Sequence, residues 1–334
     1  MLTSCVLLSP TRMRNRLLGV CLLGCLVAGV GNLPYWTRTG AWPSPTGQAP
    51  EPEPPTGMVA GDSSGLQPAI AYWRLGHQRQ VVLVLHGGPG VSHTYLRPEW
   101  DALTAAATVV YYDQRGWGRS DLATCYSWQA HVADLQRVIQ AVAPGQRLVL
   151  AGSSWGSMLA LLYAYQYPQQ VNALVLSGTF PWPGKGKRRP LWLLADLGRQ
   201  QARHVLRDTR RLDTIHERAL PSRTQVRAKA LLGSAGSPLG EAFPSWPSAP
   251  PFDSLRRISV PVLILRGDQK HVIVDQGEAF ARLLTQATLY TIPGAGHDPW
   301  LADPRTFFRR CVAFLQHVPH RNRKKETPEA SDRP

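Results

Sequence analysis

Short apolar segments that end in glycine recur along the chain, and this pattern limits the fold more than any other feature. Each is a continuous apolar run, which is typical of a strand whose two faces are both covered. These segments are residues 80–88, 107–116, 146–152, 171–178, 260–267 and 287–294. Helical patterns lie between them at residues 128–144 and 157–168, and a terminal amphipathic helix is predicted at residues 303–317. The alternation predicts an α/β fold with a mostly parallel sheet and helices on both of its faces.

The alternation is interrupted over residues 182–252. That region opens with the basic segment WPGKGKRRP, continues with a helical pattern and closes with the proline-rich segment FPSWPSAPPFD. Because it lies between two strands, we expect a helical cap inserted above the carboxyl ends of the strands, where open α/β sheets bind ligands. The core then consists of residues 59–181 and residues 253–318.

Residues 1–31 have the pattern of a targeting segment. A cluster of arginines precedes the apolar residues 17–31, as in signal peptides. This apolar stretch is shorter than the roughly 20 residues that span a bilayer comfortably. Three alternatives stay open: a cleaved secretory signal, an uncleaved membrane anchor, and a lipoprotein signal with Cys25 as the lipidated residue. In each case we expect an exported protein.

Positive charge is concentrated in a few parts of the chain, whose net charge is +15 at pH 7. Basic residues gather in the leader, in the cap and in residues 319–334, a tail that we expect to be disordered. Residues 32–58 are rich in proline and predict an extended linker. No nucleic-acid-binding motif is present, so we expect no nucleic-acid partner. The leader and the basic cap are instead candidates for contact with an anionic membrane surface.

The strongest local motif is GSSWG, residues 152–156, which follows an apolar strand and precedes a helical pattern. That is the context of a G-x-S-x-G nucleophile elbow. Large side chains at the first and last positions would collide with the strand and the helix, and the sharp turn lifts the Ser154 hydroxyl above the sheet edge. The simpler alternative is a glycine-rich turn in which Ser154 only caps the helix. We interpret Ser154 as a nucleophile.

A serine nucleophile needs a base and donors for the oxyanion. His297 lies in a glycine-rich loop after the last strand, in the order expected of the base. Trp155, which follows the nucleophile, offers one backbone N–H. The second donor should come from the loop HGGPG, residues 86–90, where Pro89 has no N–H, and we assign it to Gly88. No Lys-Ser/Thr pair follows these glycines, so a phosphate loop is excluded, and we expect neither a metal nor a cofactor.

Three motifs together resemble one known family. HGGPG at residues 86–90, DQRGWGRS at residues 113–120 and GSSWGS at residues 152–157 are similar to the proline iminopeptidases, the S33 peptidases of the α/β-hydrolase superfamily. The resemblance covers roughly residues 66–181 and 253–316. It implies an α/β-hydrolase fold with an eight-stranded sheet and a helical cap, and release of an N-terminal residue, often proline, from peptides. It also implies the same nucleophile, base and oxyanion donors.

The acid of the triad is the first departure from that family. The family usually places it three residues after the glycine that ends the strand before the histidine loop, and here that position is Lys270. A lysine cannot stabilise the imidazolium, and loss of the acid can cost about four orders of magnitude in turnover. Our candidate is Asp268, at the end of the strand. Asp275 and a triad without an acid remain as alternatives.

The charge of the cap is the second departure. Family aminopeptidases use acidic cap residues to bind the free amine of the substrate, whereas here basic residues outnumber acidic ones between residues 182 and 252. A positive cleft repels an ammonium group and attracts carboxylates, unless these side chains only line an exposed helix face. The sequence therefore favours an exported serine hydrolase that acts on a small peptide. It leaves two alternatives: a carboxylesterase for small or anionic esters, and a binding protein of this fold that has lost catalysis.

Overall fold

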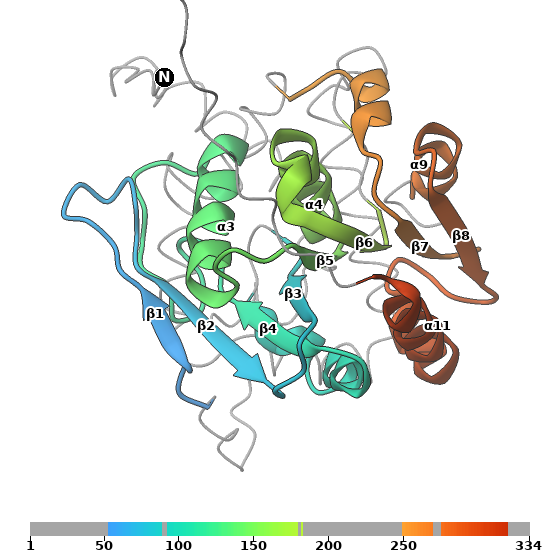
Figure 1. Ribbon diagram of the computed structural model, residues 1–334, viewed down its shortest axis with the longest axis horizontal. Helices are drawn as coiled ribbons and strands as arrows, with labels where there is room; N and C mark the ends of the chain where they lie inside the picture. Colours follow the sequence, from blue (N-terminus) through green and yellow to red (C-terminus); the bar gives the residue numbers. More distant parts are fainter. Residues whose placement is uncertain (1–52, 89–91, 180–181, 183–248, 270–274, 320–334) are drawn as a thin grey trace, which may run out of the picture.

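The computed structural model describes residues 53–88, 92–179, 182, 249–269 and 275–319. Within these residues eight strands form one sheet in the order β1-β2-β4-β3-β5-β6-β7-β8 (Figure 1). The strands are β1 (Gly57–Val59), β2 (Ile70–Leu75), β3 (Val81–Leu85), β4 (Thr108–Tyr112), β5 (Leu148–Ser153), β6 (Val171–Ser177), β7 (Val262–Gly267) and β8 (Ala287–Ile292). The two pairings that involve β2 are antiparallel and the others are parallel. The predicted fold class, a mostly parallel eight-stranded sheet, is confirmed.

Helices cover both faces of the sheet, as the sequence predicts. The helices are α3 (Trp128–Val142), α4 (Trp155–Gln166), α9 (Gly277–Leu283), α10 (Pro299–Ala302) and α11 (Pro304–His317). The 3₁₀ helices are η2 (His93–Leu96), η3 (Glu99–Ala105), η4 (Pro168–Gln170) and η6 (Phe252–Arg257). Apolar residues of α3, α4 and α9 pack on one face, and those of η3, α10 and α11 pack on the other. Alternate residues along β3 therefore enter two separate cores.

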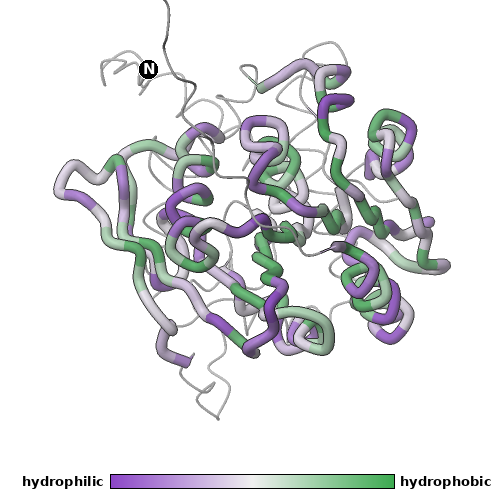
Figure 2. Tube along the Cα trace, in the orientation of Figure 1, coloured by the Kyte–Doolittle hydropathy of each residue, from purple (hydrophilic) through white to green (hydrophobic). Residues whose placement is uncertain are grey.

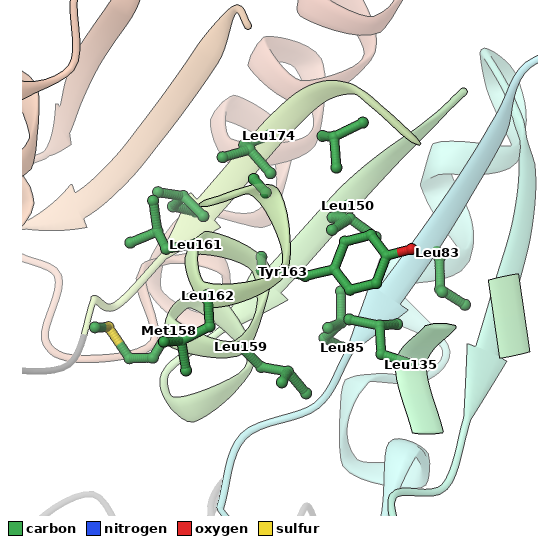
Figure 3. Close-up of a cluster of buried hydrophobic side chains, with 14 of the residues drawn as sticks. Leu83, Leu85, Leu135, Leu150, Met158, Leu159, Leu161, Leu162, Tyr163 and Leu174 are labelled. Atoms are coloured by element: carbon green, nitrogen blue, oxygen red, sulfur yellow. The ribbon is translucent and has the colours of Figure 1, made fainter. Parts of the chain in front are cut away.

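Helix α4 is apolar on almost all sides, and this explains its central place. Its leucines and Met158 are fully buried against strands β3, β5 and β6 and helix α3 (Figure 3). Such a helix belongs in the interior rather than at the surface. Helix α11 is amphipathic instead, with hydrophobic and hydrophilic residues alternating along its trace (Figure 2). The central position of α4 fixes its N-terminus at the carboxyl ends of the neighbouring strands.

The two ends of the inserted region lie together. The Trp182 indole N–H donates to the carbonyl oxygen of Pro250 at 2.8 Å, and the Trp182 backbone N–H donates to the Gln276 side chain at 3.0 Å. The chain thus leaves the sheet and returns to it at one place beside α9. Residues 183–248, which hold most of the predicted cap, lie outside the described part, as do the leader and most of the tail. None of the described helices is both long enough and apolar enough to span a bilayer.

The DQRG segment after β4 braces the fold through a buried ion pair. The Arg115 guanidinium donates to the Asp134 carboxylate of α3 at 2.7 Å and to the Cys125 carbonyl oxygen at 2.6 Å. Both charged side chains are almost fully buried, and Arg137 adds a second contact to Asp134 at 2.9 Å. Because the pair is enclosed, removal of one partner leaves an uncompensated buried charge.

We expect Asp134→Ala to lower the free energy of unfolding by about 3–5 kcal/mol, because Arg115 then stays buried without its carboxylate. The matched control is Glu278→Ala, which removes the partly exposed partner of Arg266. Its cost should stay below about 1 kcal/mol, as for other surface pairs. Urea unfolding followed by circular dichroism measures both, and equal costs for the two variants would contradict this account.

Candidate active site

Ser154 lies at a sharp turn between β5 and α4. Its backbone angles are φ 54° and ψ −118°, and among the described residues it is the only one other than glycine with a positive φ. Added Cβ atoms at Gly152 and Gly156 would overlap the Gly156 backbone and the Leu85 carbonyl oxygen, respectively. The Ser154 N–H donates to the Ser177 carbonyl oxygen at 2.9 Å. The structure therefore has the geometry of a nucleophile elbow, as the motif predicts.

The structure brings His297 to this serine across the whole core. The His297 Nε2 atom lies 2.9 Å from the Ser154 Oγ atom, although the residues are 143 positions apart. This distance is within the range over which a base accepts a proton from a hydroxyl. Both side chains are only partly buried. The predicted nucleophile and the predicted base thus form a pair that a substrate can approach.

Close backbone contacts hold the loop that carries His297. Gly178, after β6, has a φ of 52°, and a Cβ atom there would overlap the His297 carbonyl oxygen. A Cβ atom at Gly267, at the end of β7, would likewise overlap the Ala295 carbonyl oxygen. The Gln269 N–H donates to that oxygen at 3.0 Å. Each of these glycines stands at the end of an apolar strand, but this position alone does not mark it as a site residue.

The predicted oxyanion donors flank the serine. Trp155 is the first residue of α4, and the N–H groups of a first helical turn are directed outwards at the positive end of the helix dipole. Gly88 has a φ of 115° and precedes residues 89–91, which are not described. A Cβ atom at Gly87 would lie 3.3 Å from the Ser154 Cβ atom. The start of the HGGPG loop, residues 86–90, which we call the glycine loop, therefore lies directly beside the nucleophile. The roles of Gly88 and Trp155 as donors remain predictions.

A buried hydrogen-bond network connects Trp155, beside the nucleophile, with His86 at the end of β3. The Trp155 indole N–H donates to the Gln114 side-chain oxygen at 2.9 Å, and the Gln114 backbone N–H donates to His86 Nε2 at 3.0 Å. Burial lowers the pKa of His86 to about 4, so its ring is neutral. Since Nε2 accepts, the proton is on Nδ1, which donates to the Gly87 carbonyl oxygen at 2.8 Å. Gln114, in the DQRG segment that the sequence predicts to be a structural brace, thus links the glycine loop to the start of α4.

Asp268, the predicted acid, points to the backbone of the histidine loop. Its carboxylate is exposed and accepts the Gly294 N–H at 2.8 Å. Asp275 accepts the Thr179 hydroxyl at 3.0 Å and the Gly277 N–H at 2.6 Å. Within the described part of the chain, neither carboxylate hydrogen-bonds the His297 ring, and Lys270 lies outside that part. The assignment of Asp268 as triad acid therefore stays a prediction.

Known proteins resemble this chain in both sequence and fold. Over 130 residues it is 34% identical to the proline iminopeptidase of Saccharolobus solfataricus, a match that covers 37% of this chain and 42% of that protein. Over 262 residues it is 28% identical to the putative 2-succinyl-6-hydroxy-2,4-cyclohexadiene-1-carboxylate synthase of Bacillus subtilis, with 72% and 91% covered. A thermophilic esterase from Thermogutta terrifontis superposes with a TM-score of 0.59 at 21% identity, over 75% of this chain and 94% of that one.

These similarities differ in what they establish. The chain spans less than half of the length of the iminopeptidase, and the likeness to the esterase shows the fold alone. The model of the alpha/beta hydrolase fold family, however, matches residues 80–304, which is well over half of the chain. That region includes the elbow, the glycine loop and His297. The chain belongs to the alpha/beta hydrolase fold family.

Proposed function

We propose that the protein is a serine hydrolase that transfers the acyl group of its substrate to water. The observation that carries this proposal is the 2.9 Å contact between Ser154 Oγ and His297 Nε2 at the elbow. As Oγ bonds to the acyl carbon, its proton moves to Nε2 and the carbonyl oxygen becomes an oxyanion between the Gly88 and Trp155 N–H groups.

The remaining steps use the same groups. Collapse of the tetrahedral intermediate breaks the bond to the leaving amine or alcohol, which takes the proton from His297. Water then attacks the acyl-enzyme while His297 accepts one of its protons, and a second collapse releases the carboxylic acid and restores Ser154. Asp268 accepts the Gly294 N–H, so we propose that it holds the loop that carries His297, whatever its part as triad acid.

For the substrate we favour a peptide whose N-terminal residue is released, as in the proline iminopeptidases that this chain partly matches. An ester of a small or anionic acid is the second candidate, because residues 182–252 are rich in arginine and lysine. Such a charge attracts a carboxylate and repels the ammonium group of a peptide. A binding protein without catalysis is the third, since Lys270 occupies the usual position of the acid.

Ser154→Ala and His297→Ala should each lower kcat by about 10⁴-fold or more, because nucleophile and base act as one unit. The matched control is Ser259→Ala, whose side chain is exposed and precedes the amino end of β7, whereas the site lies at the carboxyl ends of the strands. It should retain the activity of the unaltered protein. Release of p-nitrophenol from p-nitrophenyl acetate measures all three. Undiminished turnover by Ser154→Ala would refute the mechanism, and an inert unaltered protein would favour the binding role.

The substrate class is tested by comparing L-proline p-nitroanilide with p-nitrophenyl acetate and p-nitrophenyl butyrate. We expect kcat/KM for the anilide to be measurable and to vanish together with ester turnover in Ser154→Ala. Turnover of the esters alone would end the peptidase proposal and leave the esterase.

Asp268→Asn distinguishes the two tasks that this carboxylate can have. Asparagine keeps an oxygen for the Gly294 N–H, so we expect kcat to fall less than about tenfold, the size of one weakened hydrogen bond. Asp268→Ala, which removes the acceptor, should cost more and also lower the melting temperature. A loss near four orders of magnitude in Asp268→Asn would instead identify Asp268 as the triad acid.

A further inference from the structure

Tyr95 touches the active site from a part of the chain with no assigned role. It lies in η2, and its hydroxyl oxygen accepts the Gly87 N–H at 2.8 Å. A Cβ atom at Gly87 would lie 2.9 Å from that oxygen and 3.3 Å from the Ser154 Cβ atom. The Tyr95 hydroxyl and the nucleophile therefore border the same side of the glycine loop.

The ring of Tyr95 also reaches the elements that follow the histidine loop. It packs on Trp300 of α10, with ring centroids 6.3 Å apart, and Trp300 is fully buried against Trp100. Burial raises the pKa of the Tyr95 hydroxyl well above its ordinary value, and the nearby Asp298 carboxylate adds to this. The raised pKa favours the neutral phenol, whose oxygen accepts from the Gly87 N–H while the hydroxyl keeps its own proton.

Two hydrogen bonds fix consecutive peptide planes of the glycine loop. The bond from the Gly87 N–H to Tyr95 fixes the plane between His86 and Gly87. The bond from His86 Nδ1 to the Gly87 carbonyl oxygen fixes the next plane, which carries the Gly88 N–H. The C=O and N–H groups of one trans peptide point in opposite directions. Since the Gly87 carbonyl oxygen faces His86 Nδ1, the Gly88 N–H of the same peptide points away from His86. With only one of the two bonds, the loop can rotate about the backbone of Gly87.

We propose that Tyr95 is a positioning residue for the oxyanion hole: its hydroxyl holds the Gly87 peptide so that the Gly88 N–H faces the oxyanion on Ser154. This inference rests on the proposed serine hydrolase function and adds a residue to it. A preorganised donor stabilises charge only when its direction is set before the reaction, and a glycine peptide without an anchor does not meet that condition.

The test compares Tyr95→Phe with Tyr112→Phe. Tyr112, in β4, is more deeply buried than Tyr95, and its hydroxyl has no hydrogen-bond partner among the described residues. For p-nitrophenyl acetate, Tyr95→Phe should lower kcat about tenfold or more with little change in KM, since one buried donor loses its partner. Tyr112→Phe should change neither constant more than about twofold. Both variants keep their aromatic ring, so the packing of residue 95 on Trp300 is retained.

Two further readouts separate positioning from loss of folded protein. Phenylboronic acid, which forms a tetrahedral adduct on a reactive serine, should bind Tyr95→Phe more weakly by the same factor as kcat falls. Titration with a fluorophosphonate should show an undiminished number of reactive sites. Equal behaviour of the two phenylalanine variants, or a loss confined to the number of reactive sites, would overturn the role of Tyr95. An unaltered protein that neither turns over ester nor reacts with fluorophosphonate would remove the proposed function itself, and this inference with it.

Discussion

The backbone at Ser154 is held in a conformation that is unfavourable for a residue with a side chain, and the rest of the site depends on it. Such a conformation costs about 1–3 kcal/mol and persists only where its surroundings determine it. Burial of one leucine contributes a similar amount, and α4 buries Leu159, Leu161 and Leu162 completely. The packing of α4 thus offsets the strain, and two glycines let strand, turn and helix approach closely enough for that packing to form.

The parallel sheet explains why residues distant in sequence meet at this turn. The carboxyl ends of β3, β5, β6, β7 and β8 lie at the same edge, so the loops that follow them are neighbours. The glycine loop follows β3, the elbow follows β5, and the His297 loop follows β8 and rests on Gly178 after β6 and Gly267 at the end of β7. Hydrogen bonds of Gln114, Asp268 and Tyr95 then fix these loops relative to one another. Catalysis by preorganised dipoles needs this kind of rigidity.

Much of this arrangement follows from local sequence patterns. Continuous apolar runs mark buried strands, and a G-x-S-x-G motif between strand and helix marks Ser154, because sterics require both glycines. His297 follows from chain order and the glycines around it. The start of α4 was predicted at residue 157 rather than at Trp155, since the motif itself forms the first helical turn.

Other features depend on contacts that sequence spacing does not determine. The direction of the Asp268 side chain is set by the backbone of a different loop, at Gly294, so an acid at the end of a strand did not by itself reveal its partner. Tyr95 acts through a long-range hydrogen bond to Gly87, and no local pattern distinguishes it from an ordinary polar residue. Gln114 lies in the DQRG motif, but its contact to Trp155 does not follow from sequence spacing. The predicted cap falls almost entirely outside the described residues, and its influence on substrate choice rests on charge alone.

The central claim is that Ser154 is the activated group of this protein. Its most direct test is to treat the folded protein with a fluorophosphonate, digest it and map the modified peptide by mass spectrometry. The account predicts one adduct, on Ser154, which disappears when His297 is replaced by alanine or the protein is unfolded first. An adduct on any other residue, or an unmodified Ser154 in folded protein, would contradict it.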